Sequence, residues 1–227
     1  MNRMKFGIVF NTESAYWYEK DVEFRKIVDS CDFLTCDGAA LAMAAKLKGV
    51  LLPRYHGPDL MADILNSQQY KRVFLLGGPP EAHEKIMRDF ALEGRQILGD
   101  ADYYSKLLPD TTLRRIREWR PDVIFVCLGL RKQERIAAQL ANSIGEIGGI
   151  VLGVGASVDF LGGTKERSSK FFQVIGLEWL PRLIREPRMF ARNLRSLRSL
   201  PMVLRGKVQI TKKGNFIANL QDLTKFL

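Results

Sequence analysis

The sequence predicts an α/β fold: a mostly parallel, Rossmann-like sheet with helices on both faces, followed by a basic helical appendage. Short segments that are apolar throughout alternate with longer segments whose apolar residues recur at helical spacing. Strands buried on both faces have this uninterrupted apolar character, whereas strands with one wet face alternate. Positive charge, by contrast, is concentrated near the C-terminal end. We therefore expect an α/β domain over residues 1–175 and an appendage over residues 176–227.

The expected elements follow from periodicity and from glycine or proline at their ends. Strands are expected at residues 5–10, 33–36, 72–76, 95–98, 121–130 and 149–155. Helices are expected at residues 16–30, 39–48, 57–66, 81–90, 111–119 and 131–142. The run at 121–130 is the clearest strand of the set, and it is predicted to lie at the centre of the sheet.

Composition excludes several classes of protein. Apolar residues make up 46% and charged residues 26% of the chain, as in soluble globular proteins. No stretch approaches the ~18 consecutive apolar residues of a membrane span, and the start of the chain does not resemble a signal peptide, so a cytoplasmic protein is expected. The 3 cysteines and 2 histidines form no cluster, which argues against a disulfide framework or a zinc site. Neither the dinucleotide nor the P-loop glycine fingerprint occurs, and we expect no cofactor.

Polar residues are predicted to gather at one edge of the sheet. The carboxyl ends of parallel strands meet at one edge, and open α/β sheets bind their ligands there. The residues delivered to this edge are Asn11, Glu13, Asp37, residues 77–78, Asp100, residues 129–134 and residues 155–159. Gly155 and Asp159 follow a glycine-rich strand end, which either makes a turn alone or also contacts phosphate or ribose. Gln133 and Glu134, by default, form a solvated first helical turn.

Asp37 is the leading candidate for a catalytic residue. It lies between the apolar run at 33–36 and the helical segment at 39–48. An aspartate at such a junction is either a helix N-cap or a ligand-binding carboxylate at the edge of the sheet. Asp59, near the start of the following helix, allows the same two interpretations, and Arg54 stands between the two acids.

The charge is divided unevenly along the chain. Residues 1–164 contain 21 Lys and Arg against 21 Asp and Glu, whereas residues 165–227 contain 14 against 4. This asymmetry indicates an anionic partner for the C-terminal part alone, either a membrane surface or nucleic acid.

From residue 176 onward, apolar and basic residues separate by helical period, and Pro181, Pro187 and Pro201 are expected to divide the segment into two or three helices. The pattern favours a helix on an anionic membrane surface; a docking helix with a solvated basic face is the simpler alternative. Nucleic acid is disfavoured, because the aromatic residues share the apolar side and are not interleaved with the basic ones. The residues expected at the membrane are Trp179, Arg182, Arg185, Arg188, Arg192 and Arg195.

Six motifs, taken together, resemble the WecG/TagA/CpsF bacterial glycosyltransferases (glycosyltransferase family 26). The resemblance covers roughly residues 11–204. Its motifs are residues 36–38 (CDG), 52–61 (LPRYHGPDLM), 74–78 (FLLGG), 128–134 (LGLRKQE), 153–163 (GVGASVDFLGG) and 176–188 (GLEWLPRLIREPR). The last three are long and occur in the order that the family shows.

The resemblance implies an inverting, metal-independent transfer of a hexose or N-acetylhexosamine from a UDP-sugar to a polyprenyl-diphosphate-linked saccharide. This reaction belongs to cell-surface polysaccharide synthesis at the inner face of the bacterial membrane. N-acetylmannosamine is the commonest donor sugar of the family, with glucose or a uronic acid close behind. Asp37 matches the proposed general base, which takes the proton of the acceptor hydroxyl.

Further matches imply substrate contacts. Arg54 matches a diphosphate contact, Asn11 and Gln133 match donor-sugar contacts, and Asp159, next to Gly155, matches a nucleotide contact; Asp59 is kept as a further substrate-binding candidate. The appendage is implied to bind the membrane and help complete the active site. The resemblance leaves a homo-oligomer open. A non-catalytic membrane- or nucleic-acid-binding protein with this fold is the alternative.

Overall fold

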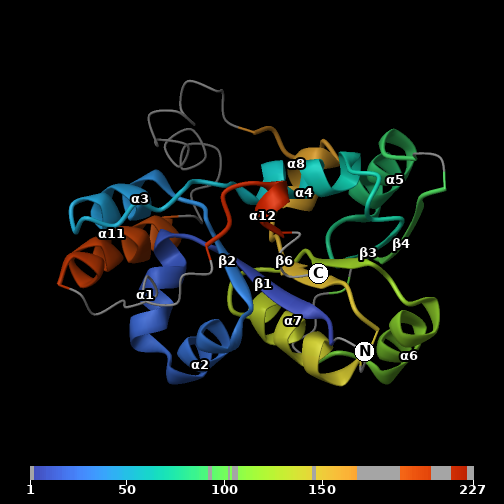
Figure 1. Ribbon diagram of the computed structural model, residues 1–227, viewed down its shortest axis with the longest axis horizontal. Helices are drawn as coiled ribbons and strands as arrows, with labels where there is room; N and C mark the ends of the chain where they lie inside the picture. Colours follow the sequence, from blue (N-terminus) through green and yellow to red (C-terminus); the bar gives the residue numbers. More distant parts are fainter. Residues whose placement is uncertain are drawn as a thin grey trace.

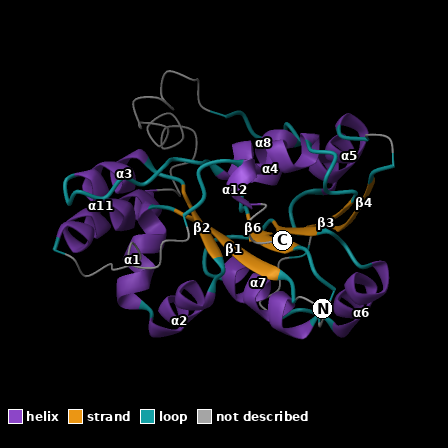
Figure 2. Ribbon diagram, viewed as in Figure 1, coloured by secondary structure: helices purple, strands orange, loops and turns teal. Residues whose placement is uncertain are grey.

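The described part of the chain forms one parallel sheet. The computed structural model describes residues 3–91, 94–101, 103, 107–144, 147–167, 190–205 and 216–223. Its six strands lie in the order β2-β1-β6-β5-β3-β4, and every neighbouring pair is parallel, which confirms the predicted fold class. Figure 2 shows the strands as a twisted layer between helices. The strands are β1 (Lys5–Phe10), β2 (Phe33–Cys36), β3 (Arg72–Leu76), β4 (Gln96–Asp100), β5 (Val123–Val126) and β6 (Ile150–Gly153).

Helices cover both faces of this sheet. They are α1 (Thr12–Lys20), α2 (Val22–Ser30), α3 (Ala39–Lys46), α4 (Gly57–Asn66), α5 (Pro80–Asp89), α6 (Asp110–Trp119), α7 (Lys132–Ser143), α8 (Ser157–Leu161), α11 (Phe190–Leu204) and α12 (Leu220–Leu223). Figure 1 shows α1, α2, α6 and α7 on one face and α4, α5, α8 and α12 on the other, with α3 and α11 together at the β2 end.

The uninterrupted apolar strands are explained by burial on both sides. β5 lies between β6 and β3, inside the sheet as predicted, and all four of its residues are buried. Ile124 and Val126 join the core on the α7 face, whereas Val123 and Phe125 join the core on the α4 face. Successive side chains of a strand point to opposite faces, so a strand covered on both sides has no position for a polar residue.

The first predicted helix, at residues 16–30, is in fact two helices. α1 ends at Lys20 and α2 begins at Val22. Asp21 between them has extended backbone dihedrals, and its Oδ1 accepts a hydrogen bond from the N–H of Phe24 at 3.0 Å. Aspartate is a strong N-cap, so this one side chain starts a new helix inside a continuous amphipathic pattern.

Part of the appendage lies outside the described residues, including Trp179, Arg182, Arg185 and Arg188 with two of its prolines. The described helix α11 contains Pro201, so the expectation that this proline breaks the helix is wrong. Pro201 lies in the last turns, where the proline removes only one intrahelical hydrogen bond, and the N–H of Arg205 still bonds its carbonyl at 2.9 Å. Among the described residues, no helix is long and apolar enough to cross a bilayer.

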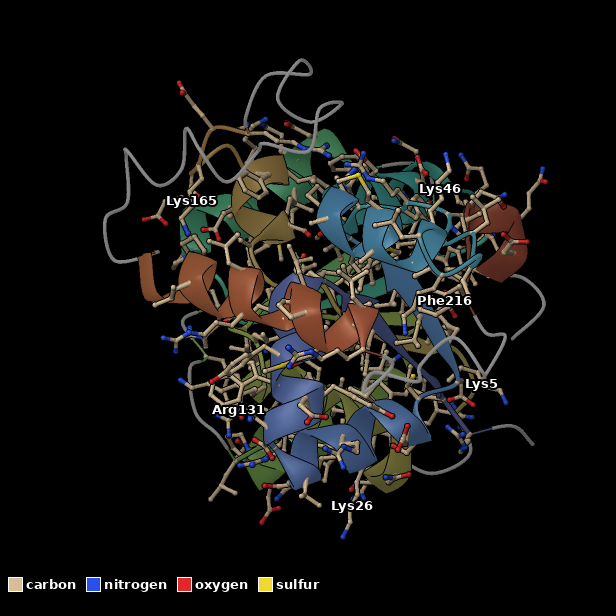
Figure 3. All side chains as sticks on the ribbon, turned by 90° about the vertical axis from the view of Figure 1, so that its left-hand side faces the viewer. Lys5, Lys26, Lys46, Arg131, Lys165 and Phe216 are labelled. Carbon is tan, nitrogen blue, oxygen red and sulfur yellow. The ribbon has the colours of Figure 1, made fainter. Side chains whose placement is uncertain are left out.

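Helix α11 packs against α1 and α3. Figure 3 looks onto this end of the molecule and shows α11 crossing in front, with α1 below it and α3 above. Nε of Arg195 donates to Oε1 of Glu13 at 2.9 Å, and the Glu13 side chain is only 5% exposed. The same guanidinium lies 5.6 Å from the centre of the Trp17 ring. Arg195 thus joins the appendage to the first helix after β1; a membrane contact for it stays a prediction, as it does for Arg192.

Removing this ion pair is expected to destabilise the protein. Arg195→Ala leaves a buried carboxylate with one charged partner fewer, which should lower the free energy of unfolding by about 2 kcal/mol. Arg198→Ala is the matched control, because Arg198 is exposed on the same helix and should change stability by less than about 0.5 kcal/mol. Urea denaturation followed by circular dichroism measures both; equal midpoints for the two variants would contradict the assignment.

Candidate active site

Asp37 lies where β2 ends at the carboxyl edge of the sheet. Its N–H bonds the carbonyl of Phe10 at 2.8 Å, which continues the ladder between β1 and β2. The N-cap position of α3 belongs to Gly38, one residue later. The carboxylate of Asp37 accepts a hydrogen bond from His56 and is 31% exposed. The interpretation of Asp37 as a helix cap is therefore wrong, and its carboxylate is accessible at the edge.

His56 connects Asp37 to Arg54. Nδ1 of His56 lies 2.7 Å from Oδ1 of Asp37, and NH2 of Arg54 lies 3.2 Å from Nε2 of His56. A guanidinium only donates, so Nε2 must be the accepting nitrogen and Nδ1 must carry the hydrogen that it donates to Asp37. The three side chains form a directed chain of hydrogen bonds that ends on the carboxylate.

The backbone sets up this chain. Arg54 forms a parallel bridge with Cys36, and the N–H of Tyr55 bonds the carbonyl of Cys36 at 3.0 Å. This bridge lays the segment before α4 beside the end of β2. His56 is the N-cap residue of α4 and thereby faces Asp37. Sequence reasoning missed His56; its place two residues after Arg54, between two acids, was the available signal.

Asp59, in the first turn of α4, has a different partner. NH1 and NH2 of Arg167 donate to its two carboxylate oxygens at 2.6 and 3.0 Å. The hydrogen bonds from Arg167, aided by its positive charge, hold the pKa of Asp59 below its ordinary value. Asp59 is thus ionised and oriented near His56, and Arg167 is a charged residue of this region that the sequence did not indicate.

Gln133 and Glu134 are buried, so the expectation of a solvated helical turn is wrong. They lie in the first turn of α7, the helix that follows β5, and the glycine turn at the end of β6 lies against Gln133. A Cβ on Gly153 would come within 3.2 Å of the Gln133 side chain, and one on Gly155 within 3.4 Å of its Oε1. Gly155 also has a φ of +56°, which glycine adopts without strain. Glycine is favoured at Gly155 by its positive φ, and a side chain at Gly153 would crowd Gln133.

The amide of Gln133 is held in one orientation. Its Nε2 donates to Oε1 of Glu134 at 2.8 Å, while its own Oε1 is buried with no hydrogen-bond partner among the described residues. A buried acceptor without a donor is costly, and a ligand that supplies a hydroxyl or N–H group would satisfy it.

Glu134 is fully buried beside this amide. Its Oε2 accepts the N–H of Arg131 at 2.6 Å, and Arg131 has a φ of 73°, rare for a residue other than glycine. Burial raises the pKa of Glu134 to about 7, and the nearby charge of Glu13 adds to the rise. Glu134 therefore titrates near neutral pH under the edge of the sheet.

Asn11 and Asp159 occupy the neighbouring strand ends. Oδ1 of Asn11 accepts the N–H of Ser14 at 2.9 Å and caps α1. The carboxylate of Asp159, in α8, lies 3.2 Å from both Thr164 Oγ1 and Lys165 Nζ. Both residues lie at the predicted edge, and each has a local structural role there.

The edge contains two groups of residues. One is built on β2 and α4 and contains Asp37, Arg54, His56 and Asp59; the other is built on the starts of α7 and α8. They adjoin where α4 begins, because a Cβ on Gly57 would come within 2.8 Å of Ser157 Oγ. Among the described residues, no group of three His, Cys, Asp or Glu could hold a metal ion.

A cavity of about 390 Å³ lies at the opposite edge, where β3, β5 and β6 begin. Among its lining residues, Asp122 already accepts the N–H groups of Lys71 and Arg72 at 2.8 Å each. Its carboxylate therefore serves to hold the strand starts together. The carboxyl edge contains the Asp37 carboxylate, which His56 orients, and the buried Oε1 atom of Gln133. It is therefore the better candidate for the active site.

The fold and the edge define an α/β protein whose polar site lies where parallel strands end, the usual position for ligands of open sheets. A family model described as the glycosyl transferase WecG/TagA/CpsF family matches residues 2–213, so the chain belongs to that family and is a glycosyltransferase. The resemblance noted in the sequence is thereby confirmed.

Two curated relatives are N-acetylglucosaminyldiphosphoundecaprenol N-acetyl-β-D-mannosaminyltransferases. The one from Bacillus spizizenii is 28% identical over 233 aligned positions, which cover 100% of this chain and 88% of the relative. The one from Staphylococcus aureus is 26% identical over 205 positions, covering 88% of this chain and 78% of the relative.

The titration of Glu134 predicts a pH dependence of stability. Between its ordinary pKa of 4.5 and about 7, the folded chain holds more protons on this residue than the unfolded chain. The free energy of unfolding should therefore fall as pH rises through that window, by about 3 kcal/mol at most, and level off above it. Glu134→Gln should lack this part of the slope.

Urea denaturation at intervals from pH 4.5 to 8 measures the effect. Glu84→Gln, an exposed glutamate on α5, is the control and should keep the slope of the parent. Identical slopes in the parent and in Glu134→Gln would show that Glu134 does not titrate in this window.

Proposed function

We propose that this glycosyltransferase moves an N-acetylmannosamine-type sugar or glucose from a UDP-sugar to a saccharide linked to polyprenyl diphosphate. Two relatives named as mannosaminyltransferases that act on N-acetylglucosaminyldiphosphoundecaprenol support the acceptor class. The observation that carries the proposal is the Asp37 carboxylate, accessible at the carboxyl edge and oriented by His56.

In the proposed reaction, Asp37 is the general base. The acceptor hydroxyl attacks the anomeric carbon of the donor sugar, its proton passes to the carboxylate, and the nucleoside diphosphate leaves with the bonding electrons. One base suffices for such a direct displacement with inversion. Oδ1 of Asp37 is occupied by His56, whereas Oδ2 has no hydrogen-bond partner among the described residues and is the oxygen that would take the proton.

His56 acts as a positioning residue in this scheme. The hydrogen bond from Nδ1 fixes the carboxylate plane, and the donation from Arg54 to Nε2 keeps the imidazole in the matching tautomer. Arg54 is placed beside the base, where its charge would also meet the diphosphate of the leaving group.

The second group of residues would hold the donor. The buried carbonyl oxygen of Gln133 is suited to accept a hydrogen bond from a hydroxyl or N–H group of the donor. Gly155 allows a ligand to approach the backbone closely, and Asn11, Asp59 and Asp159 lie at or beside the same edge as further contacts.

The appendage would hold the enzyme at an anionic membrane surface on the cytoplasmic side, where a lipid-linked acceptor is presented. The excess of basic residues in the C-terminal part supports this placement.

Asp37→Asn is expected to abolish most of the activity. Asparagine keeps the shape and can still accept from His56, but it cannot take up a proton, so kcat should fall by about 100-fold to 10,000-fold. Asp110→Asn, an exposed aspartate at the start of α6, should retain full activity. Sugar transfer from labelled UDP-sugars to a lipid-linked acceptor measures both, and full activity of Asp37→Asn would refute the general-base role.

His56 provides a second test, because two substitutions separate its hydrogen bond from its bulk. His56→Ala removes the donor to Asp37 and should lower kcat roughly tenfold, the effect of losing one hydrogen bond to a charged group. In His56→Asn an amide nitrogen can replace Nδ1 as donor, so most of the activity should return. If the two variants lose equal activity while both remain folded, His56 does not act through this hydrogen bond.

A further inference from the structure

The two helices at the β2 end of the molecule expose apolar side chains on their outer sides. Met43 and Leu47 of α3 are 64% and 74% exposed, and Leu51, in the turn that follows, is 84% exposed. On α11, the exposed residues Leu194, Leu197, Pro201 and Leu204 recur at steps of three and four and so share one face. Helices α3 and α11 pack together, so these side chains lie at one end of the molecule (Figure 3).

Positive charge accompanies these side chains. Lys46 and Lys48 are exposed around the end of α3, Arg198 is exposed on the apolar face of α11, and Arg205 is exposed directly after this helix. No Asp or Glu occurs from Gly38 to Pro58 or from residue 190 to 205. Exposed leucines together with basic residues, in segments that contain no acidic residue, are typical of a surface that binds anionic lipid.

We propose that α3, its following turn and α11 form a single surface, the α3–α11 face, that docks on an anionic lipid bilayer. The inference rests on the proposed function and deepens it, because it assigns membrane contact to a helix of the catalytic body as well as to the appendage. A second copy of the chain is a poorer occupant, since two copies of this face would bring cations against cations.

The position of the face relative to Asp37 supports this assignment. α3 begins two residues after Asp37, and its eight residues span about 12 Å. Leu47 therefore lies one short helix away from the proposed base. A bilayer against this face would bring the diphosphate of an embedded lipid close to the edge of the sheet, where Arg54 lies.

Vesicle flotation tests the proposal with the full chain. The probe is a vesicle of phosphatidylcholine with phosphatidylglycerol, and a vesicle of phosphatidylcholine alone tests the need for negative charge. Leu47→Glu/Leu51→Glu should lower the partition coefficient on anionic vesicles at least tenfold, because two apolar side chains no longer enter the lipid. Lys46→Gln/Lys48→Gln should lower it roughly fivefold per charge and leave the weak binding to neutral vesicles unchanged.

The chain offers matched controls away from this face. Val22, at the start of α2, and Leu107, before α6, are 61% and 75% exposed. Val22→Glu and Leu107→Glu should float as the parent does, and thermal unfolding should show that all variants are folded. Equal flotation of the leucine pair and the controls would overturn the proposal. So would a lower molecular mass by light scattering for the leucine pair without any loss of flotation, which would identify the face as a contact between copies.

An activity measurement separates this inference from the proposed function. The leucine pair should lose transfer to a long-chain acceptor embedded in anionic vesicles but keep transfer to a short-chain, water-soluble analogue. Loss with both acceptors would overturn the docking role and indicate damage to the site. A parent enzyme inactive on both acceptors would refute the proposed function, whereas flotation would still decide the docking surface.

Discussion

The parallel bridge between Cys36 and Arg54 is the constraint on which the candidate site depends. The bridge joins the last residue of β2 to Arg54, which lies shortly before α4, and so adds one residue pair to this side of the sheet. Through it, His56 meets a carboxylate 19 residues earlier in the chain. The intervening segment contains α3, so the same bridge returns the chain from that helix to the sheet edge. The arrangement of the candidate site thus depends on one pairing of residues 18 positions apart.

Two buried acids, Glu13 and Glu134, lie under the carboxyl edge of the sheet. Glu13 follows β1 and pairs with Arg195 of α11, while Glu134 follows β5 and orients Gln133. Each lies in the first turn of a helix that starts at the carboxyl edge, where the helix dipole favours a negative charge. Both side chains are removed from water and held by directed hydrogen bonds, and the pair with Arg195 attaches α11 to the start of α1.

Much of the architecture could be predicted because the interior strands, which are buried on both faces, are apolar throughout. Val123 to Val126 has no polar residue, and that pattern alone placed it inside the sheet. The break at Asp21 escaped prediction because the amphipathic period continues across it and one capping side chain decided the outcome. Gln133 and Glu134 were misjudged because polar residues in a first helical turn are usually solvated, whereas here both are buried and the turn at Gly153 approaches Gln133 closely.

The sequence by itself determined the fold class, the edge at which polar residues gather, the candidacy of Asp37 and Arg54, and the basic character of the appendage. These properties follow from periodicity, composition and motif, which act over a few residues. Tertiary structure alone decided that His56 holds Asp37, that Asp59 pairs with an arginine 108 residues away, and that Arg195 reaches Glu13. Such pairs depend on how distant segments pack, and neither the periodicity nor the composition of a segment specifies its partner across the fold.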